Sequence, residues 1–250
     1  MKRLKYHADV NERLLEIFQT GIQQWYRKEG RDLPWRHTTN PYHILISEIL
    51  LHQTTVKTVE PVYRRFLNRF PTIRDLAESS LEDVKAITDP LGYKIRGQWL
   101  HEIAQTIQRD FRGEFPQTLD ALLSLPGIGR YTAGAILSFA FGHDAPILDT
   151  NVNRVIGRYF HIDYKNSKAE IKHQLWSIAD AIVPSGQARE FNNALMDLGA
   201  VICRARKPQC LVCPVAEGCA MLADQVVRAA EERVQYRLRV STGKQDEDVQ

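Results

Sequence analysis

The four cysteines of the chain lie in one short window, and they constrain its fold more than any other feature. They are Cys203, Cys210, Cys213 and Cys219, spaced C-x6-C-x2-C-x5-C, and no other cysteine occurs in the 250 residues. A secreted disulfide protein would spread its cysteines to close loops along the chain. Four thiolates in one loop instead predict tetrahedral zinc or a [4Fe–4S] cluster, and the spacing does not separate these two. Four free buried cysteines are the alternative.

The same window is rich in positive charge. Arg204, Arg206 and Lys207 lie between the first two cysteines. A loop held rigid by a metal or cluster and carrying these cations would suit contacts with phosphates.

Most of the remaining chain has helical periodicity. Leu14, Phe18, Ile22 and Trp25, for example, form one apolar stripe at helical spacing. We find no strand alternation and no internal repeat, so we predict an all-α fold. Residues 223–250 are rich in charge, and we expect them to form a flexible tail.

Bulk composition excludes some classes and is neutral on others. The net charge of +3 and hydrophobic content of 44% are ordinary, so composition alone does not indicate nucleic acid. No apolar run is long enough to span a bilayer, and no apolar segment follows the basic first residues as in a signal peptide. We expect a cytoplasmic monomer with no membrane partner.

The stretch LSLPGIGRYTAGAIL places two glycines between two apolar helical segments. Gly127 and Gly129 permit close backbone approach, and a helix is expected to begin near Arg130. Free N–H groups at such a helix start can bind a phosphate. The alternative is an αα-hairpin whose glycines only allow tight packing.

Two carboxyl groups stand out by their surroundings. Glu48 is the single charge in ILISEILLHQ, where burial would raise its pKa and make it a general acid. It could instead face solvent or pair with a buried arginine. Asp149 follows an apolar segment and precedes a helix, so the N-cap is its default role, in which it stays ionised. One neutral acid and one anion would suit a reaction passing through a sugar oxocarbenium ion.

Taken together, these features resemble the helix-hairpin-helix DNA glycosylases, the superfamily that contains endonuclease III. The matching blocks run from about Leu33 to Cys219 in the same order: LPWR, PYxxxxSEILLxQT, LGY, LPGIGRYTAGAI, ILDTNVNRV, FNNALMDLGAVIC and the cysteine quartet. The resemblance implies two lobes, a six-helix domain with the hairpin over residues 37–147 and a discontinuous iron–sulfur domain over residues 1–36 and 148–222. The charged tail, residues 223–250, follows.

The resemblance also implies roles for single residues. The cysteine quartet would hold a [4Fe–4S] cluster rather than zinc, and the Gly127–Gly129 hairpin would clasp a DNA phosphate. Glu48 would protonate the departing base, and Asp149 would stabilise the cation at the sugar C1′. Asn151 matches a position near the active site of the adenine enzymes.

Tyr131 occupies the position where bifunctional members of the superfamily carry a lysine. A phenol cannot form an imine with the sugar, so we expect hydrolysis of the glycosidic bond without strand cleavage. Tyr131 would then hydrogen-bond Glu48 or pack the pocket.

Flipping a base out of the duplex requires side chains that fill the gap. His52 and Gln53 match the polar wedge position of the family, and Tyr93 matches an aromatic that inserts beside the opposite base. The alternative for Tyr93 is a half-exposed aromatic in a turn.

The branch within the superfamily decides the substrate. The most similar branches are the MutY-type adenine glycosylases and the mismatch-specific thymine glycosylases. We favour adenine opposite guanine or 8-oxoguanine in double-stranded DNA, with thymine or uracil opposite guanine as the alternative. Only about thirty residues follow Cys219, whereas the adenine branch usually carries a further C-terminal domain. A non-catalytic iron–sulfur DNA-binding module is the more distant alternative.

Overall fold

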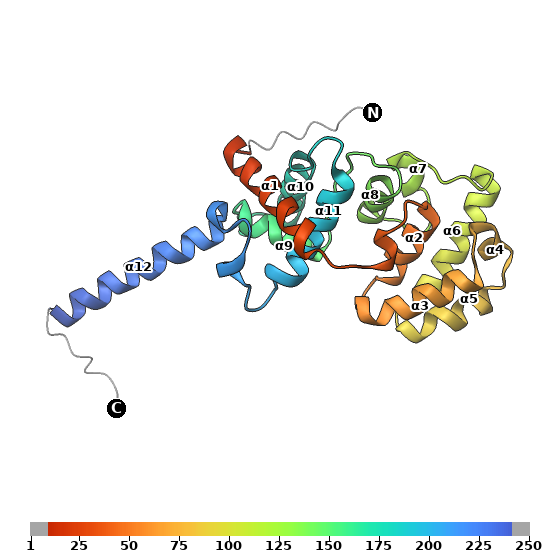
Figure 1. Cartoon of the computed structure of the whole chain (residues 1–250), viewed down its shortest axis with the longest axis horizontal. Coiled ribbons are helices and arrows are strands. Elements are labelled where there is room, and N and C mark those ends of the chain that lie inside the picture. The colour runs from red at the N-terminus through yellow and green to blue at the C-terminus, as the bar shows by residue number, and fades with distance from the viewer. Residues whose placement is uncertain (1–9, 242–250) are drawn as a thin grey trace.

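The computed structural model of the chain describes residues 10–241, and this part is built from helices without a β-strand (Figure 1). The predicted all-α fold is therefore confirmed. The α-helices are α1 (Glu12–Glu29), α2 (Pro41–Leu50), α3 (Val56–Arg69), α4 (Ile73–Glu78), α5 (Leu81–Thr88), α6 (Ile95–Phe111), α7 (Leu119–Leu123), α8 (Arg130–Phe139), α9 (Thr150–Tyr159), α10 (Lys168–Ala181), α11 (Ala188–Asp197) and α12 (Ala220–Ser241). Short turns are η1 (Pro34–Arg36), η2 (Asp89–Leu91), the π-helical η3 (Leu198–Ile202), η4 (Cys210–Val212) and η5 (Ala216–Gly218).

The helices gather into two lobes that lie side by side (Figure 1). Helices α2 to α8 form one lobe, in which α4 and α5 pack on α6 and α2 packs on α8. Helices α1 and α9 to α11 form the other, in which α1 packs on α11 and α10 on α9. Because α1 belongs to the second lobe, the chain crosses between the lobes twice. Contact of α11 with α8 joins them.

Helix α2 is buried on almost every side and forms the centre of its lobe. Asn40 caps it by accepting from the Tyr42 N–H, and Pro41 fits its first turn, where no N–H partner is needed. Every residue from Ile44 to Leu50 is buried. The apolar run that the sequence shows around position 48 is therefore core and not one face of a surface helix.

The C-terminal segment differs from our expectation. Residues 223–241, predicted as part of a flexible tail, belong to the regular helix α12, which extends away from the lobes (Figure 1). Charged residues at helical spacing are equally compatible with a solvated helix, and composition does not separate the two. Residues 242–250 of the predicted tail, and residues 1–9, lie outside the described part of the chain.

Candidate active site and DNA-binding face

A groove of about 1170 Å³ lies where α2, α8, α9 and α10 meet. It joins a recess of about 60 Å³, and the two share the side chains of Glu48 and Tyr131. The groove also brings together the following predicted residues: Asp149, Asn151, His52, Gln53, Gly129 and Arg130. Tyr93, Gly127, Arg204, Lys207 and the cysteines lie outside it.

Glu48 sits in the wall between groove and recess, and only 4% of it is exposed. Burial raises the pKa of Glu48 to about 7, and the nearby charge of Asp149 adds to this. A hydrogen bond from Tyr131 and the charge of Arg36 act in the opposite direction but are weaker. Near neutrality this carboxyl group can therefore hold a proton and release it.

Asp149 caps α9, as its sequence position predicts. Its Oδ1 accepts from the Val152 N–H at 2.6 Å, and its Oδ2 accepts from Asn151 Nδ2 at 3.1 Å. Burial nevertheless raises the pKa of Asp149, because desolvation outweighs these two hydrogen bonds. The cap position predicted for Asp149 is therefore observed, whereas its ionised state stays a prediction.

Tyr131 lies between the two carboxyl groups. Burial and the charges of Glu48 and Asp149 raise its pKa well above the ordinary value of a phenol. Its hydroxyl interacts with Glu48 and lies 3.5 Å from the sulfur of Met196 on α11. Tyr131 therefore stays a neutral donor across the physiological range.

A buried ion network behind Glu48 escaped the sequence analysis. Asp197, at the end of α11, accepts from Arg31 Nε at 2.7 Å and from Arg36 Nη1 and Nη2 at 2.7 and 2.6 Å. Burial alone would raise the pKa of Asp197, but the hydrogen bonds and charge of Arg36 hold it below its usual value. Both arginines line the recess. Arg36 lies in the block LPWR and Asp197 in the block FNNALMDLGAVIC, both of which resemble the family. A charged residue inside each of these blocks was the sequence signal that could have indicated an ion pair.

The network also answers one alternative for Glu48. Arg36 is close enough to influence its charge, yet both terminal nitrogens of Arg36 bind Asp197. Among residues 10–241 no ion pair to Glu48 is present. Glu48 is thus neither on the solvent face nor neutralised by an arginine.

Arg154 connects Asp149 to the cysteine segment. Its Nη2 donates to Asn151 Oδ1 at 2.7 Å and to the Gly199 carbonyl at 2.7 Å, and its Nε donates to the Cys203 carbonyl at 2.7 Å. Because Asn151 Oδ1 is occupied by Arg154, its Nδ2 faces Asp149. The orientation of Asn151 is therefore set from the cysteine side.

The four cysteines come together at the base of the second lobe. The thiols of Cys203, Cys210 and Cys219 are near enough to Cys213 to raise its pKa, although burial contributes more. Among the described residues, no three His, Cys, Asp or Glu side chains form a group that could hold a single metal ion. A four-iron cluster is larger than one ion and needs more widely spaced thiolates, so the donor set fits the cluster better than zinc.

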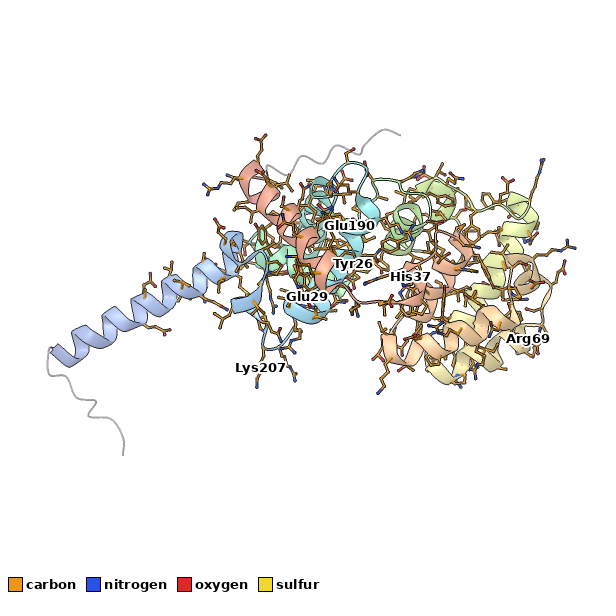
Figure 2. All side chains as sticks on the ribbon, in the orientation of Figure 1. Tyr26, Glu29, His37, Arg69, Glu190 and Lys207 are labelled. Carbon is orange, nitrogen blue, oxygen red and sulfur yellow. The ribbon has the colours of Figure 1, made fainter. Side chains whose placement is uncertain are left out.

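The cationic loop lies beside these cysteines and outside the groove. Arg204 is exposed, and Lys207 has a left-handed backbone with φ of 50°. Figure 2 shows Lys207 at the edge of the molecule, on the loop between η3 and Cys210. Arg158 Nη1 anchors the loop by donating to the Arg204 carbonyl at 2.8 Å.

The glycine hairpin joins α7 to α8. Gly127 has φ of 70°, the positive value expected there, whereas Gly129 has φ of −93° and only precedes the helix. The N-cap Gly129 has no side chain to cap α8, and a helix start of this kind can bind a phosphate. At this helix start, the Arg130 guanidinium stacks on Trp176, 3.9 Å from the ring centroid.

Comparisons with known proteins agree with this geometry. Residues 46–181 match the model of the HhH-GPD superfamily base excision DNA repair proteins, and residues 203–219 match the iron–sulfur binding domain of endonuclease III. The chain belongs to the HhH-GPD superfamily. In this member, the second match and the four cysteines support a [4Fe–4S] cluster.

Relatives of this HhH-GPD protein include enzymes of two activity classes. An adenine DNA glycosylase of Buchnera aphidicola (subsp. Acyrthosiphon pisum) is 42% identical over 81% of this chain and 58% of its own length. A thymine/uracil-DNA glycosylase of Pyrobaculum aerophilum is 41% identical over 80% of this chain and 88% of its own. The chain thus spans less than two thirds of the adenine relative.

The fold comparison gives the same family. A thermostable thymine-DNA glycosylase superposes with a TM-score of 0.79 at 36% identity, over 85% of this chain and 98% of that one.

In residues 10–241, no helix combines the length and apolar character needed to cross a bilayer.

Proposed function

We propose that this HhH-GPD protein removes a mispaired base from double-stranded DNA by hydrolysing its N-glycosidic bond. The observation that carries the proposal is that Glu48, a buried carboxyl with a pKa of about 7, and Asp149, a carboxyl that caps a helix, line the same groove. A departing base needs a proton, and the sugar cation left behind needs an anion.

The reaction assigns one step to each group. The C1′–N bond breaks with its electron pair on the base, which takes the Glu48 proton. Asp149 stabilises the cation at C1′ while it exists, and Asn151 and Arg154 hold this carboxylate in position. Water then adds to C1′, and its proton restores the protonated Glu48. Tyr131 has no amine, so the strand stays intact.

Adenine is the base that we favour, because the recess offers a hydrogen-bond acceptor beside a protonated acid. Asn193 lines the recess and donates its Nδ2 to the Arg189 carbonyl at 2.9 Å, so its Oδ1 remains to accept. Adenine presents an amino donor and the N7 acceptor on one edge, which matches Asn193 Oδ1 and protonated Glu48. A recess of 60 Å³ receives only this edge, and the rest of the base lies on the groove floor.

We assign the remaining predicted residues to DNA and to the cluster. His52, Gln53 and Tyr93 would enter the duplex, and Gly127, Gly129, Arg130, Arg204 and Lys207 would contact phosphates. The cluster ligands would be Cys203, Cys210, Cys213 and Cys219, in a lobe of residues 1–36 and 148–222 beside one of residues 37–147. When bound, the cluster holds this loop rigid. We infer a monomer that acts in the cytoplasm, on the DNA of the nucleoid.

A panel of labelled duplexes tests the proposal. The protein is incubated with duplexes containing A opposite 8-oxoguanine, A:G, T:G and U:G, and the products are treated with alkali to cut at abasic sites. Cleavage at the two adenine duplexes is the expected result. Strand cleavage without alkali, trapped by borohydride, would overturn the hydrolytic mechanism.

Thymine or uracil opposite guanine is the second candidate. It is favoured by the 41% identical thymine/uracil relative and by the superposition on a thymine-DNA glycosylase. Cleavage of the T:G and U:G duplexes alone would establish it in place of adenine.

A further inference from the structure

Three segments that would face DNA converge on one side chain outside the groove, the indole of Trp99 on α6. The His52 ring packs edge-on against it at 6.1 Å between centroids, and the Tyr93 ring does the same at 5.7 Å. The indole also lies against the backbone of Gly127, where an added Cβ would overlap it. Trp99 thus touches the wedge segment after α2, the turn before α6 and the glycine hairpin.

Arg96, one helical turn before Trp99, binds the backbone of the wedge segment, which is the end of α2 and the residues His52 and Gln53 after it. Its side chain is fully buried and among the largest in the core. Nη1 donates to the Leu50 carbonyl at 3.1 Å, and Nη2 donates to the His52 carbonyl at 2.6 Å. These are carbonyls at the C-terminal end of α2, where a cation also interacts favourably with the helix dipole.

A buried guanidinium of this kind is costly to retain for stability alone. No carboxylate forms an ion pair with Arg96 in residues 10–241, and its Nε has no hydrogen-bond partner there. Burial lowers the pKa of Arg96. Since a buried charge without an ionic partner tends to destabilise a fold, the contacts of this arginine point to a role other than packing.

The bond from Arg96 to His52 acts on the residue that would enter the duplex. The His52 carbonyl belongs to the peptide bond that leads into Gln53, and Gln53 has a left-handed backbone with φ of 55°. That conformation costs a non-glycine residue on the order of 1 kcal/mol and persists where neighbours enforce it. The hydrogen bond from Arg96 and the contact of His52 with Trp99 hold the residue directly before Gln53 and so support this conformation.

We propose that Arg96 and Trp99 are positioning residues that lock His52–Gln53, Tyr93 and the Gly127 hairpin into one rigid unit for flipping the target base. Separate loops would each be ordered on binding, at a cost in conformational entropy. A preassembled unit lets phosphate grip, wedge insertion and contact with the opposite base act together. This inference rests on the proposed function, because it concerns the step that precedes base removal.

The test separates base flipping from chemistry with two substrates. In a fully paired duplex the enzyme must unstack the target base, whereas in a short unpaired bubble most of that cost is absent. Trp99→Ala should slow single-turnover excision from the duplex by about tenfold or more, since small misplacements of positioned groups have effects of that size. Excision from the bubble should change by less than about twofold. Trp25→Ala, on α1 and outside groove and recess, is the matched control and should leave both rates unchanged.

Two further variants guard against simple misfolding. Arg96→Lys can reach one of the two carbonyls and should give an intermediate duplex rate, and Arg96→Met should resemble Trp99→Ala. Equal losses on duplex and bubble would mean that Arg96 and Trp99 only support the fold. That result would overturn the inference.

A fluorescence measurement distinguishes failure of this inference from failure of the proposed function. 2-Aminopurine next to the target base reports unstacking without chemistry, in an Asp149→Asn background. If the wild type excises bases and Trp99→Ala leaves the fluorescence rise unchanged, the inference is wrong and the function stands. If the wild type excises none of the panel bases but Trp99→Ala abolishes the rise, the unit flips bases and the proposed chemistry is wrong.

Discussion

Glu48 and Asp149 are carboxyl groups on the same groove, but the two regions that hold them are built differently. Glu48 projects from the middle of a helix whose neighbours are all buried, and no backbone N–H is free to reach it. Asp149 stands at a helix start, where the Val152 N–H and Asn151 stabilise its anion. Burial raises the pKa of both groups, but the donors of a helix start oppose that rise at Asp149, whereas the middle of a helix offers Glu48 no such backbone donor.

The largest loss of excision activity is expected from substituting Asp149. Asp149→Asn keeps the cap but removes the charge, so excision should fall by about 10³-fold or more, in the range seen for loss of a key electrostatic group. Single-turnover excision and a DNA-binding titration measure the two consequences. Asp163→Asn, in an exposed loop of the same lobe, is the control. A comparable loss of DNA affinity would show that Asp149 serves binding instead.

Burial of Glu48 should make the free energy of unfolding depend on pH. The folded pKa of Glu48, about 7, lies above that of an exposed glutamate, so stability is full at acid pH and falls as pH rises through this interval. Above pH 7 the cost in stability reaches at most about 3.5 kcal/mol, from ~1.4 kcal/mol per unit over a rise from 4.5 to about 7. Glu48→Gln should therefore be more stable than wild type at pH 8 and no more stable near pH 4.5.

Thermal or urea unfolding at both pH values measures this difference. Glu29→Gln, at the exposed end of α1, is the matched control and is measured at the same two pH values. An equal gain at pH 4.5 and pH 8 would contradict the burial of an ionisable Glu48.

The proton on Glu48 should also set how the rate of excision depends on pH. Excision by the wild type should decline about tenfold per pH unit above pH 7, as Glu48 loses the proton that the base requires. Glu48→Gln should be slow and nearly flat over this range, while Asp149→Asn should keep the wild-type slope. If Asp149→Asn removed the slope and Glu48→Gln kept it, the two roles would have to be exchanged.

The smallest loss of excision activity is expected from substituting Arg154, which connects Asn151 to the Cys203 carbonyl. Arg154→Met removes the donor that orients Asn151 toward Asp149, and excision should fall about fivefold to tenfold, typical of a lost orienting contact. Because Arg154 does not line the groove, we expect kcat to fall while the DNA Kd is kept. The absorbance of the cluster near 400 nm should stay unchanged, and its loss would mean that Arg154 only anchors the Cys203 loop.

Local sequence determined a large part of this protein. Helical periodicity predicted the all-α fold, and Asp149 was recognised as a cap because capping depends on residues three positions apart. The cysteine spacing located the cluster segment for the same reason, since its ligands lie within 17 residues. The helix over the first part of the charged tail was not predicted, because composition alone does not separate a solvated helix from an irregular chain.

Only the tertiary structure decided how the candidate groups behave. The sequence left Glu48 between solvent face, ion pair and buried acid, and the choice depended on packing by residues far away in the chain. The bond between Arg36 and Asp197 joins positions 161 residues apart, and the bond between Arg96 and His52 joins positions 44 residues apart. A pKa and a long-range contact depend on which distant segments exclude water from a group, and no local pattern records that.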